Sequence, residues 1–120
     1  MKLLIKLSSL LAACFFAVLH LETILRFGFG FGRPPLYVAD DTMGYRLVTN
    51  QNVRRFGNRI FINEYSMRAG AISPKPMPQT LRLFLLGDSL ANGNWWTDQD
   101  DILSNRIAAS LQPALVEPYT

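Results

Sequence analysis

One apolar run near the N-terminus constrains the fold more than any other feature of this 120-residue chain. It extends from Leu7 to Leu21, is interrupted only by two serines and a histidine, and follows Lys2 and Lys6. A helix over residues 3-25 would be roughly 34 Å long at 1.5 Å per residue, which exceeds a hydrocarbon core of about 30 Å. If this segment crosses a membrane, roughly 90 residues remain, enough for one small domain.

Four interpretations of this leader stay open. In the first it is a retained single-pass anchor, N-terminus inside, whose residues 3-25 contact membrane lipid while Lys6 and Glu22 reach the two interfaces. In the second it is a cleaved export signal, although no convincing small-residue cleavage site follows the run. The third is a lipoprotein signal ending at Cys14, and the fourth is a buried helix of a soluble protein. In the first three interpretations the rest of the chain is exported.

The composition excludes several kinds of site. One cysteine excludes a disulfide scaffold, and one histidine excludes the common Cys/His zinc sites. Twelve cations against nine acids give a net charge of +3, a bias too weak to indicate nucleic-acid binding. We therefore expect no metal, no other cofactor and no nucleic-acid partner, and the sequence leaves the oligomeric state open.

Glycines and prolines divide the chain into segments. A Gly/Pro spacer covers 27-35, where phenylalanines alternate with glycines at the expected membrane interface. Prolines between Ser73 and Pro78 exclude regular structure and mark a linker, 74-80. The predicted units are a signal anchor (1-26), the spacer (27-35), a β-rich lead-in (36-73), the linker (74-80) and a final α/β unit (81-120).

Within the lead-in, short runs of β-forming residues alternate with turn residues. We predict strands at 36–38, 45–48 and 59–62, and turns at 40–41, 50–52 and 56–58. The segment from Gly44 to Arg82 carries seven cations and one acid, Glu64. It is either a solvated face or a surface that rests on anionic headgroups.

The final unit begins with an apolar run, Leu81 to Leu86, which ends at Gly87. Continuous apolar character is typical of a strand covered on both faces in a parallel sheet. Thr97 and Asp98 can cap a helix over 99–111 whose apolar residues form one stripe. A second strand is predicted to begin at 114–116. Strand, turn and helix in this order predict an α/β unit.

The turn after the predicted strand reads Gly87-Asp88-Ser89-Leu90-Ala91-Asn92-Gly93. A serine at the carboxyl end of a parallel strand projects into the crevice where such sheets bind ligands. The amides that follow it can face a developing oxyanion. The alternative is an ordinary polar turn in which Asp88 or Ser89 satisfies backbone amides.

These residues carry a family resemblance. Gly87-Asp88-Ser89-Leu90 with Gly93 resembles the first block of the SGNH, or GDSL, serine hydrolases. Three upstream stretches are similar to a recurring lead-in of membrane-anchored bacterial members: Gly44-Tyr45-Arg46-Leu47, Asn50-Gln51-Asn52 and Ile62-Asn63-Glu64-Tyr65-Ser66-Met67-Arg68. The likeness extends from about Pro34 to Val116.

The resemblance implies a fold, a site and a location. The fold is α/β: an N-terminal transmembrane helix, a short β-rich lead-in, and the start of a three-layer α/β/α flavodoxin-like (SGNH) domain that is incomplete. Ser89 would be the nucleophile and its own amide an oxyanion donor, with Gly87, Asp88, Leu90 and Gly93 supporting the motif. The substrate would be an acyl ester or an O-acetylated carbohydrate. The domain would face the periplasm or outside, anchored in the bacterial cytoplasmic membrane.

The base that the family uses, a histidine three residues after an aspartate, has no counterpart here. The only histidine, His20, lies in the leader. A serine hydroxyl without an adjacent base is a poor nucleophile. We therefore expect an N-terminal fragment of a longer hydrolase, inactive alone. The alternatives are a small membrane-tethered binding module, with the basic 44–82 segment as its contact surface, and a non-functional remnant.

Overall fold

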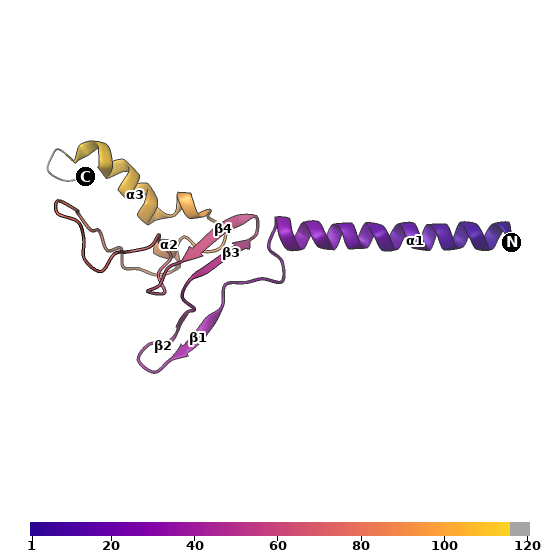
Figure 1. Cartoon of the computed structure of the whole chain (residues 1–120), viewed down its shortest axis with the longest axis horizontal. Helices are drawn as coiled ribbons and strands as arrows, with labels where there is room; N and C mark the ends of the chain where they lie inside the picture. The colour runs from indigo at the N-terminus through magenta and orange to yellow at the C-terminus, as the bar shows by residue number, and fades with distance from the viewer. Residues whose placement is uncertain (116–120) are drawn as a thin grey trace.

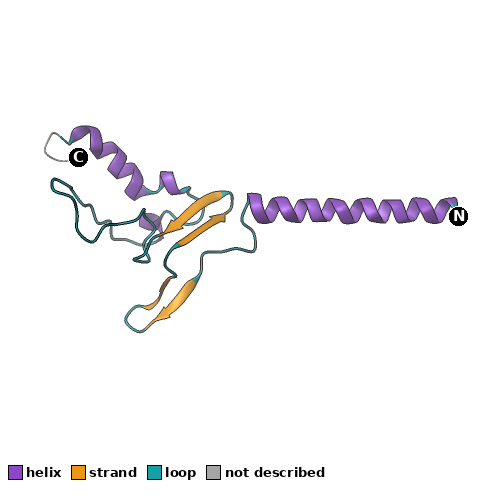
Figure 2. Cartoon of the chain, in the orientation of Figure 1, coloured by secondary structure: helices purple, strands orange, loops and turns teal. Residues whose placement is uncertain are grey.

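The computed structural model describes residues 1–115. A long N-terminal helix projects from a small head made of two β-hairpins, two short helices and their connecting loops (Figure 1; Figure 2). The molecule measures 81 × 39 × 23 Å. It is elongated because the helix has no buried side chain and stands away from the head.

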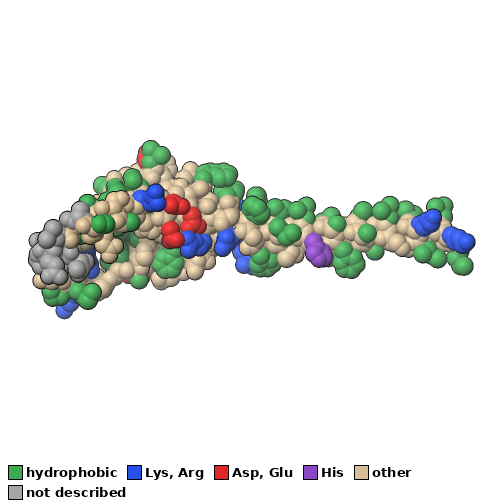
Figure 3. All heavy atoms as spheres, turned by 90° about the horizontal axis from the view of Figure 1, so that it is seen from above, with side chains coloured by type: hydrophobic (Ala, Val, Ile, Leu, Met, Phe, Trp, Pro, Cys, Tyr) green, Lys and Arg blue, Asp and Glu red, His purple; other side chains and the backbone are tan. Residues whose placement is uncertain are grey.

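Helix α1 covers Lys2–Thr23 and continues through a π-helical turn, Ile24–Gly28. Together they form a 27-residue helix that is long and apolar enough to cross a membrane and lies outside the head. Figure 3 shows hydrophobic side chains along it, with cations at both ends. The Ser8, Ser9 and Thr23 hydroxyls donate to helix carbonyls at 2.7–2.9 Å, which satisfies them without water. The predicted N-terminal apolar helix is therefore confirmed.

Two antiparallel hairpins follow. In the first, β1 (Tyr37–Asp40) pairs with β2 (Gly44–Leu47), and in the second, β3 (Gln51–Arg55) pairs with β4 (Asn58–Ile62). The first turn is stabilised by the Asp40 carboxylate, whose Oδ1 accepts from the amides of Thr42 and Met43. The second turn consists of Phe56 and Gly57 with φ of 50° and 83°, the left-handed pair that a two-residue hairpin loop requires.

The three strands predicted from the lead-in are present, but the turn predicted at 50–52 is wrong in part. Gln51 and Asn52 open β3. The Gln51 side chain is buried, and its amide joins the two hairpins: Oε1 accepts from Leu36 N at 2.7 Å, and Nε2 donates to the carbonyls of Leu36 and Val48. Gln51 therefore supplies inter-hairpin hydrogen bonds that a turn residue would not make.

A small core holds the second hairpin against the C-terminal segment. Ile60 and Ile62 of β4 are fully buried and Ile102 is 1% exposed. The helix predicted over 99–111 is divided at Ile102, between a 3₁₀ turn, Gln99–Asp101, and α3, Leu103–Leu111. The extended backbone of Ile102 (ψ 150°) accompanies the burial of its side chain. Asp98 caps the first turn by accepting from Asp100 N, as predicted.

The strand predicted at 81–86 is wrong for the described structure, where this run has no regular secondary structure. The four strands of residues 1–115 pair within their own hairpins, so none lies beside this run. A strand needs a neighbour to satisfy its backbone groups, and its side chains stay exposed without one. A parallel sheet is therefore absent from residues 1–115. Of the second predicted strand, Ala114 lies in a 3₁₀ turn, Gln112–Ala114, and Val116 lies outside the described residues.

The spacer 27-35 docks on the head. Phe29 O accepts from Gly57 N at 3.1 Å, and Phe31 N donates back to Leu25 O at the end of the long helix. Gly30 is buried with φ +73°, and a Cβ there would overlap the carbonyl oxygen of Arg54. The segment therefore needs glycine at position 30 to bring its backbone against β3.

Replacing Gly30 tests this docking. Gly30→Ala is expected to destabilise the head by ~2–4 kcal/mol, because it combines a left-handed non-glycine residue with a backbone clash. The matched control is Gly28→Ala, since a Cβ at Gly28 would meet nothing within 4 Å. The measurement is urea unfolding of the full chain in detergent, followed by tryptophan fluorescence. Equal midpoints for the two variants would show that the spacer does not dock.

Candidate active-site turn

The Gly-Asp-Ser segment forms the start of a single helical turn, α2 (Ser89–Asn92). Asp88 is its N-cap, and Asp88 Oδ1 accepts from Leu90 N at 2.9 Å. Gly93 ends the turn in the left-handed conformation, with its amide donating to carbonyls of the turn. The predicted turn is thus stabilised by helix capping, and the Asp88 carboxylate is engaged in the capping hydrogen bond.

Both glycines of the motif are sterically required. A Cβ at Gly87 would lie 2.7 Å from Ala91 Cβ, and one at Gly93 would lie 2.8 Å from a methyl group of Ile102. Gly93 also has φ +78°, which favours glycine. The close approach of Gly93 to buried Ile102 fixes the end of α2 against the core.

Ser89 is the exposed residue at the start of this turn. Within residues 1–115 its hydroxyl has no hydrogen-bond partner, and neither do the amides of Ser89 and Ala91. A free hydroxyl beside free amides is the local arrangement that acyl transfer requires. The only histidine does not join it: His20 lies in α1, with Nδ1 2.7 Å from Phe16 O. Within residues 1–115 the structure therefore places a free serine hydroxyl beside unpaired amides, with no histidine near them.

Arg68 holds the loop that follows α2. The residue is 6% exposed, and its guanidinium faces a cage of oxygens. Nη1 donates to the backbone carbonyls of Asn92 and Asn94, and Nη2 donates to those of Arg59 and Thr97. Nε donates to the side-chain amide oxygen of Gln99. Burial lowers the pKa of Arg68, and the negative charge of Asp98 opposes that change. The carbonyls of α2, of the 94–97 loop and of β4 thus share one cation.

This role was not predicted from the sequence, where Arg68 is treated only as a cation of a basic segment and as the last residue of a lead-in stretch. Buried Asn63 positions it: Asn63 Oδ1 accepts from the amides of Tyr65 and Met67, and Nδ2 donates to Gly70 O at 3.1 Å. The signal that could have revealed the cage is an arginine five residues after a turn-forming asparagine at the end of a strand.

Ion pairs use two more of the seven cations. Arg59 Nη2 lies 2.5 Å from Asp98 Oδ1 and 2.6 Å from Asp100 Oδ2. These bonds raise the pKa of Arg59, and the Arg59 side chain and amide lower the pKa of Asp98. Arg46 pairs with Asp40 at 3.1 Å. With Arg68 buried, three of the seven cations serve the fold itself, which reduces the basic surface predicted for 44–82.

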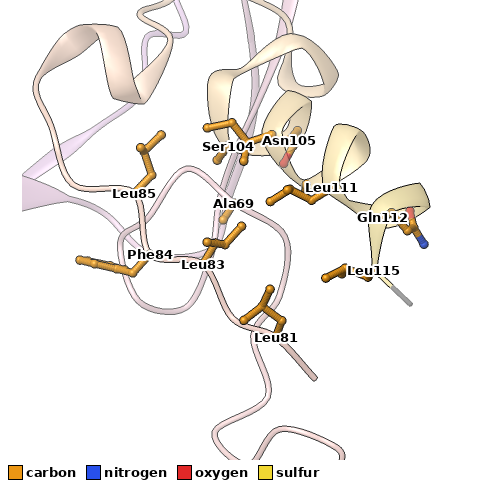
Figure 4. Close-up of a pocket in the computed structure, with 12 residues that line it drawn as sticks. Ala69, Leu81, Leu83, Phe84, Leu85, Ser104, Asn105, Leu111, Gln112 and Leu115 are labelled. Carbon is orange, nitrogen blue, oxygen red and sulfur yellow. The ribbon is translucent and has the colours of Figure 1, made fainter. Parts of the chain in front are cut away.

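Two cavities lie beside the 81–87 run, and one of them reaches the turn. One, of about 270 Å³, is lined by Arg68, Leu85, Gly87, Ala91 and neighbouring residues, without Ser89. The other, of about 390 Å³, separates the 81–85 run from α3 (Figure 4). Its lining is mostly apolar, including Leu81, Leu83, Ile107 and Leu111. The apolar run and the helix stripe thus face each other across an open space.

Within residues 1–115 no group of three His, Cys, Asp or Glu side chains lies close enough together to hold a metal ion.

Removing the cation of the cage should loosen the whole turn. Arg68→Met is expected to cost about 3 kcal/mol of unfolding free energy, because several buried carbonyls lose their donor. Arg68→Lys should retain only part of this stabilisation, since an ammonium group cannot reproduce the planar donor geometry of a guanidinium. Urea unfolding read by Trp95 and Trp96 fluorescence measures the change, with exposed Arg82→Met as the control. If Arg68→Met unfolds at the same urea concentration as Arg82→Met, the cage does not stabilise the fold.

Acid should weaken the bond between Arg59 and Asp98. Because folding lowers the pKa of Asp98, its carboxylate stabilises the fold above the ordinary aspartate value near pH 4, and this stabilisation is lost as the pH falls below it. The melting temperature of the wild type should therefore drop more steeply from pH 6 to pH 3 than that of Asp98→Asn. Part of the slope should persist, since Asp40 also has a lowered pKa.

Asp41→Asn is the matched control, because Asp41 is exposed and forms no ion pair within residues 1–115. It should keep the wild-type slope. An unchanged slope in Asp98→Asn would mean that the bond between Asp98 and Arg59 adds nothing to stability.

Comparison with known proteins returned no relative: no family model, no curated protein and no solved structure matches this chain.

Proposed function

We propose that this chain is an exported, membrane-anchored serine hydrolase of the SGNH, or GDSL, type, with Ser89 as its nucleophile. It would be held in the bacterial cytoplasmic membrane by α1, with the head facing outward. The observation that carries the proposal is the exposed Ser89 hydroxyl at the start of α2, beside the unpaired amides of Ser89 and Ala91. The reaction would be ester hydrolysis, or deacetylation or transfer of an O-acyl group on a carbohydrate.

In this reaction Ser89 Oγ attacks the acyl carbonyl carbon and loses its proton to a base. The resulting oxyanion accepts hydrogen bonds from the amides at the start of α2, which stabilise it relative to the free ester. Collapse of the intermediate breaks the ester bond, releases the protonated alcohol and leaves acyl-Ser89. Water, or a second alcohol in a transfer reaction, then takes the acyl group and restores the serine.

The base must come from residues beyond those described, and the surface around Ser89 supports this. Leu83, Phe84, Leu86 and Leu90 are 60%, 74%, 84% and 81% exposed. Four large apolar side chains close in sequence form an uncovered patch of the kind that further polypeptide covers. The proposal is therefore that more polypeptide completes a sheet on the 81–86 run and supplies the histidine, and that residues 1–115 alone hydrolyse esters negligibly.

A thiol at position 89 tests the amide donors without needing a base. In a Cys14→Ser background, Ser89→Cys is compared with Ser73→Cys, which places a thiol on an exposed residue just before the linker. Acylation by p-nitrophenyl acetate forms an oxyanion, whereas alkylation by iodoacetamide forms none. The ratio of the two rates should be roughly 10-fold or more higher at position 89, because the amides stabilise only the oxyanion.

The alkylation arm corrects for a more acidic thiol at a helix start. The background protein with Ser89 intact should stay unacylated, because its hydroxyl has no base. Equal rate ratios at positions 89 and 73 would show that the turn provides no oxyanion site, and Ser89 would then be a polar turn residue.

A further inference from the structure

The junction between the long helix and the head contains a cleft that the proposed reaction does not use. Its volume is about 210 Å³, and it is lined by residues of the helix end, the spacer and β3. Three of the lining residues are arginines, Arg26, Arg33 and Arg54, and no aspartate or glutamate is among them. Segments from three parts of the chain thus bring cations to one place.

These cations are only partly neutralised. Arg26 Nη2 lies 2.5 Å from Glu22 Oε1 on the same helix. The Arg33 guanidinium stands 5.1 Å from the centre of the Phe27 ring, and Arg54 Nη1 donates to Gly57 O at 2.9 Å. Within residues 1–115, Arg33 and Arg54 have no carboxylate partner. The cleft therefore has a net positive charge with one acid at its edge.

The position of the cleft along the helix axis matches that of the lipid headgroup layer. The apolar stretch between Lys6 and Glu22 is roughly 24 Å long, and Arg26 lies about 6 Å, one turn, beyond Glu22. With a hydrocarbon core of about 30 Å, Arg26 and the cleft fall among the phosphates when the helix spans the bilayer. The exposed Phe27 ring on which Arg33 rests is of the kind found at this boundary.

We propose that this cleft binds the phosphate of an anionic phospholipid in the leaflet from which α1 emerges. The inference rests on the membrane-anchoring part of the proposed function and is independent of Ser89 chemistry. Guanidinium groups suit a phosphate because their planar donors match its oxygens in pairs. A headgroup without its own cation fits best, since the cleft already holds an excess of positive charge.

The bound lipid would orient the head as well as attach it. Gly30 lies in the cleft and packs on the backbone of Arg54, so the helix end and β3 are joined at the same point. A phosphate held between Arg33 of the spacer and Arg54 of β3 links these two segments again. The lipid should therefore stabilise the head against unfolding.

The test uses the full chain in nanodiscs of phosphatidylcholine alone, or of phosphatidylcholine mixed with phosphatidylglycerol. The thermal midpoint of the head is read by tryptophan fluorescence. Phosphatidylglycerol should raise the wild-type midpoint by roughly 5 °C. Arg33→Gln and the double variant Arg33→Gln/Arg54→Gln should lose most of that rise. Arg82→Gln should keep it, because Arg82 lies outside the cleft and bonds to Ser73 O.

Each outcome has a distinct meaning. The midpoint in phosphatidylcholine alone reports folding, and each variant's rise is measured from its own midpoint there, because Arg33→Gln also removes the contact with the Phe27 ring. A rise of equal size in wild type and Arg33→Gln would overturn the lipid site while leaving the anchor intact. An equal rise when millimolar inorganic phosphate is added to phosphatidylcholine nanodiscs would reassign the cleft to a soluble anion. A chain that does not co-elute with nanodiscs would overturn the anchor and the lipid site together.

Discussion

The head depends on one buried cation. Removing a guanidinium from water is costly unless each of its donors finds an acceptor, and the burial of Arg68 is matched by four carbonyls and one side-chain amide. Those acceptors come from β4, from the end of α2, from the loop before the 3₁₀ turn and from Gln99 at the start of that turn. A single side chain therefore joins segments that share no strand pairing with one another.

From this cage the contacts extend toward the membrane helix. The loop that Arg68 holds presents Trp96, whose ring stacks on Phe56 at 3.9 Å between centres and 3° between planes. Phe56 in turn meets Phe31 of the spacer edge-on at 5.9 Å. Arg55 lies over the Phe56 ring at 4.2 Å. Since Phe56 sits in a left-handed turn, these ring contacts offset the cost of its backbone conformation. The candidate active-site turn and the end of α1 are thus connected through side chains.

The Ser89 turn combines both interpretations that the sequence allowed. Asp88 caps α2, as expected of an ordinary polar turn, and the capping leaves Ser89 Oγ free, as expected of a nucleophile. Residues 1–115 thus contain the serine and the amides that the proposed reaction uses but not the base that it needs. The apolar run before the turn and the stripe on α3 line one open cavity, so the same region that lacks a base also lacks a packed core.

The features that depend on near neighbours are predictable from the sequence: the long apolar helix, the turns at Asp40 and at Phe56-Gly57, the caps at Asp88 and Asp98, and the absence of structure around the prolines. Each of these arises from contacts within a few residues, which composition and spacing reveal. Other features depend on contacts between residues far apart in the sequence and are seen only in the fold: Gln51 joins two hairpins, Gly30 packs on β3 and Arg68 is buried. The 81–86 run forms no strand for the same reason, because pairing requires a partner that the local sequence does not specify.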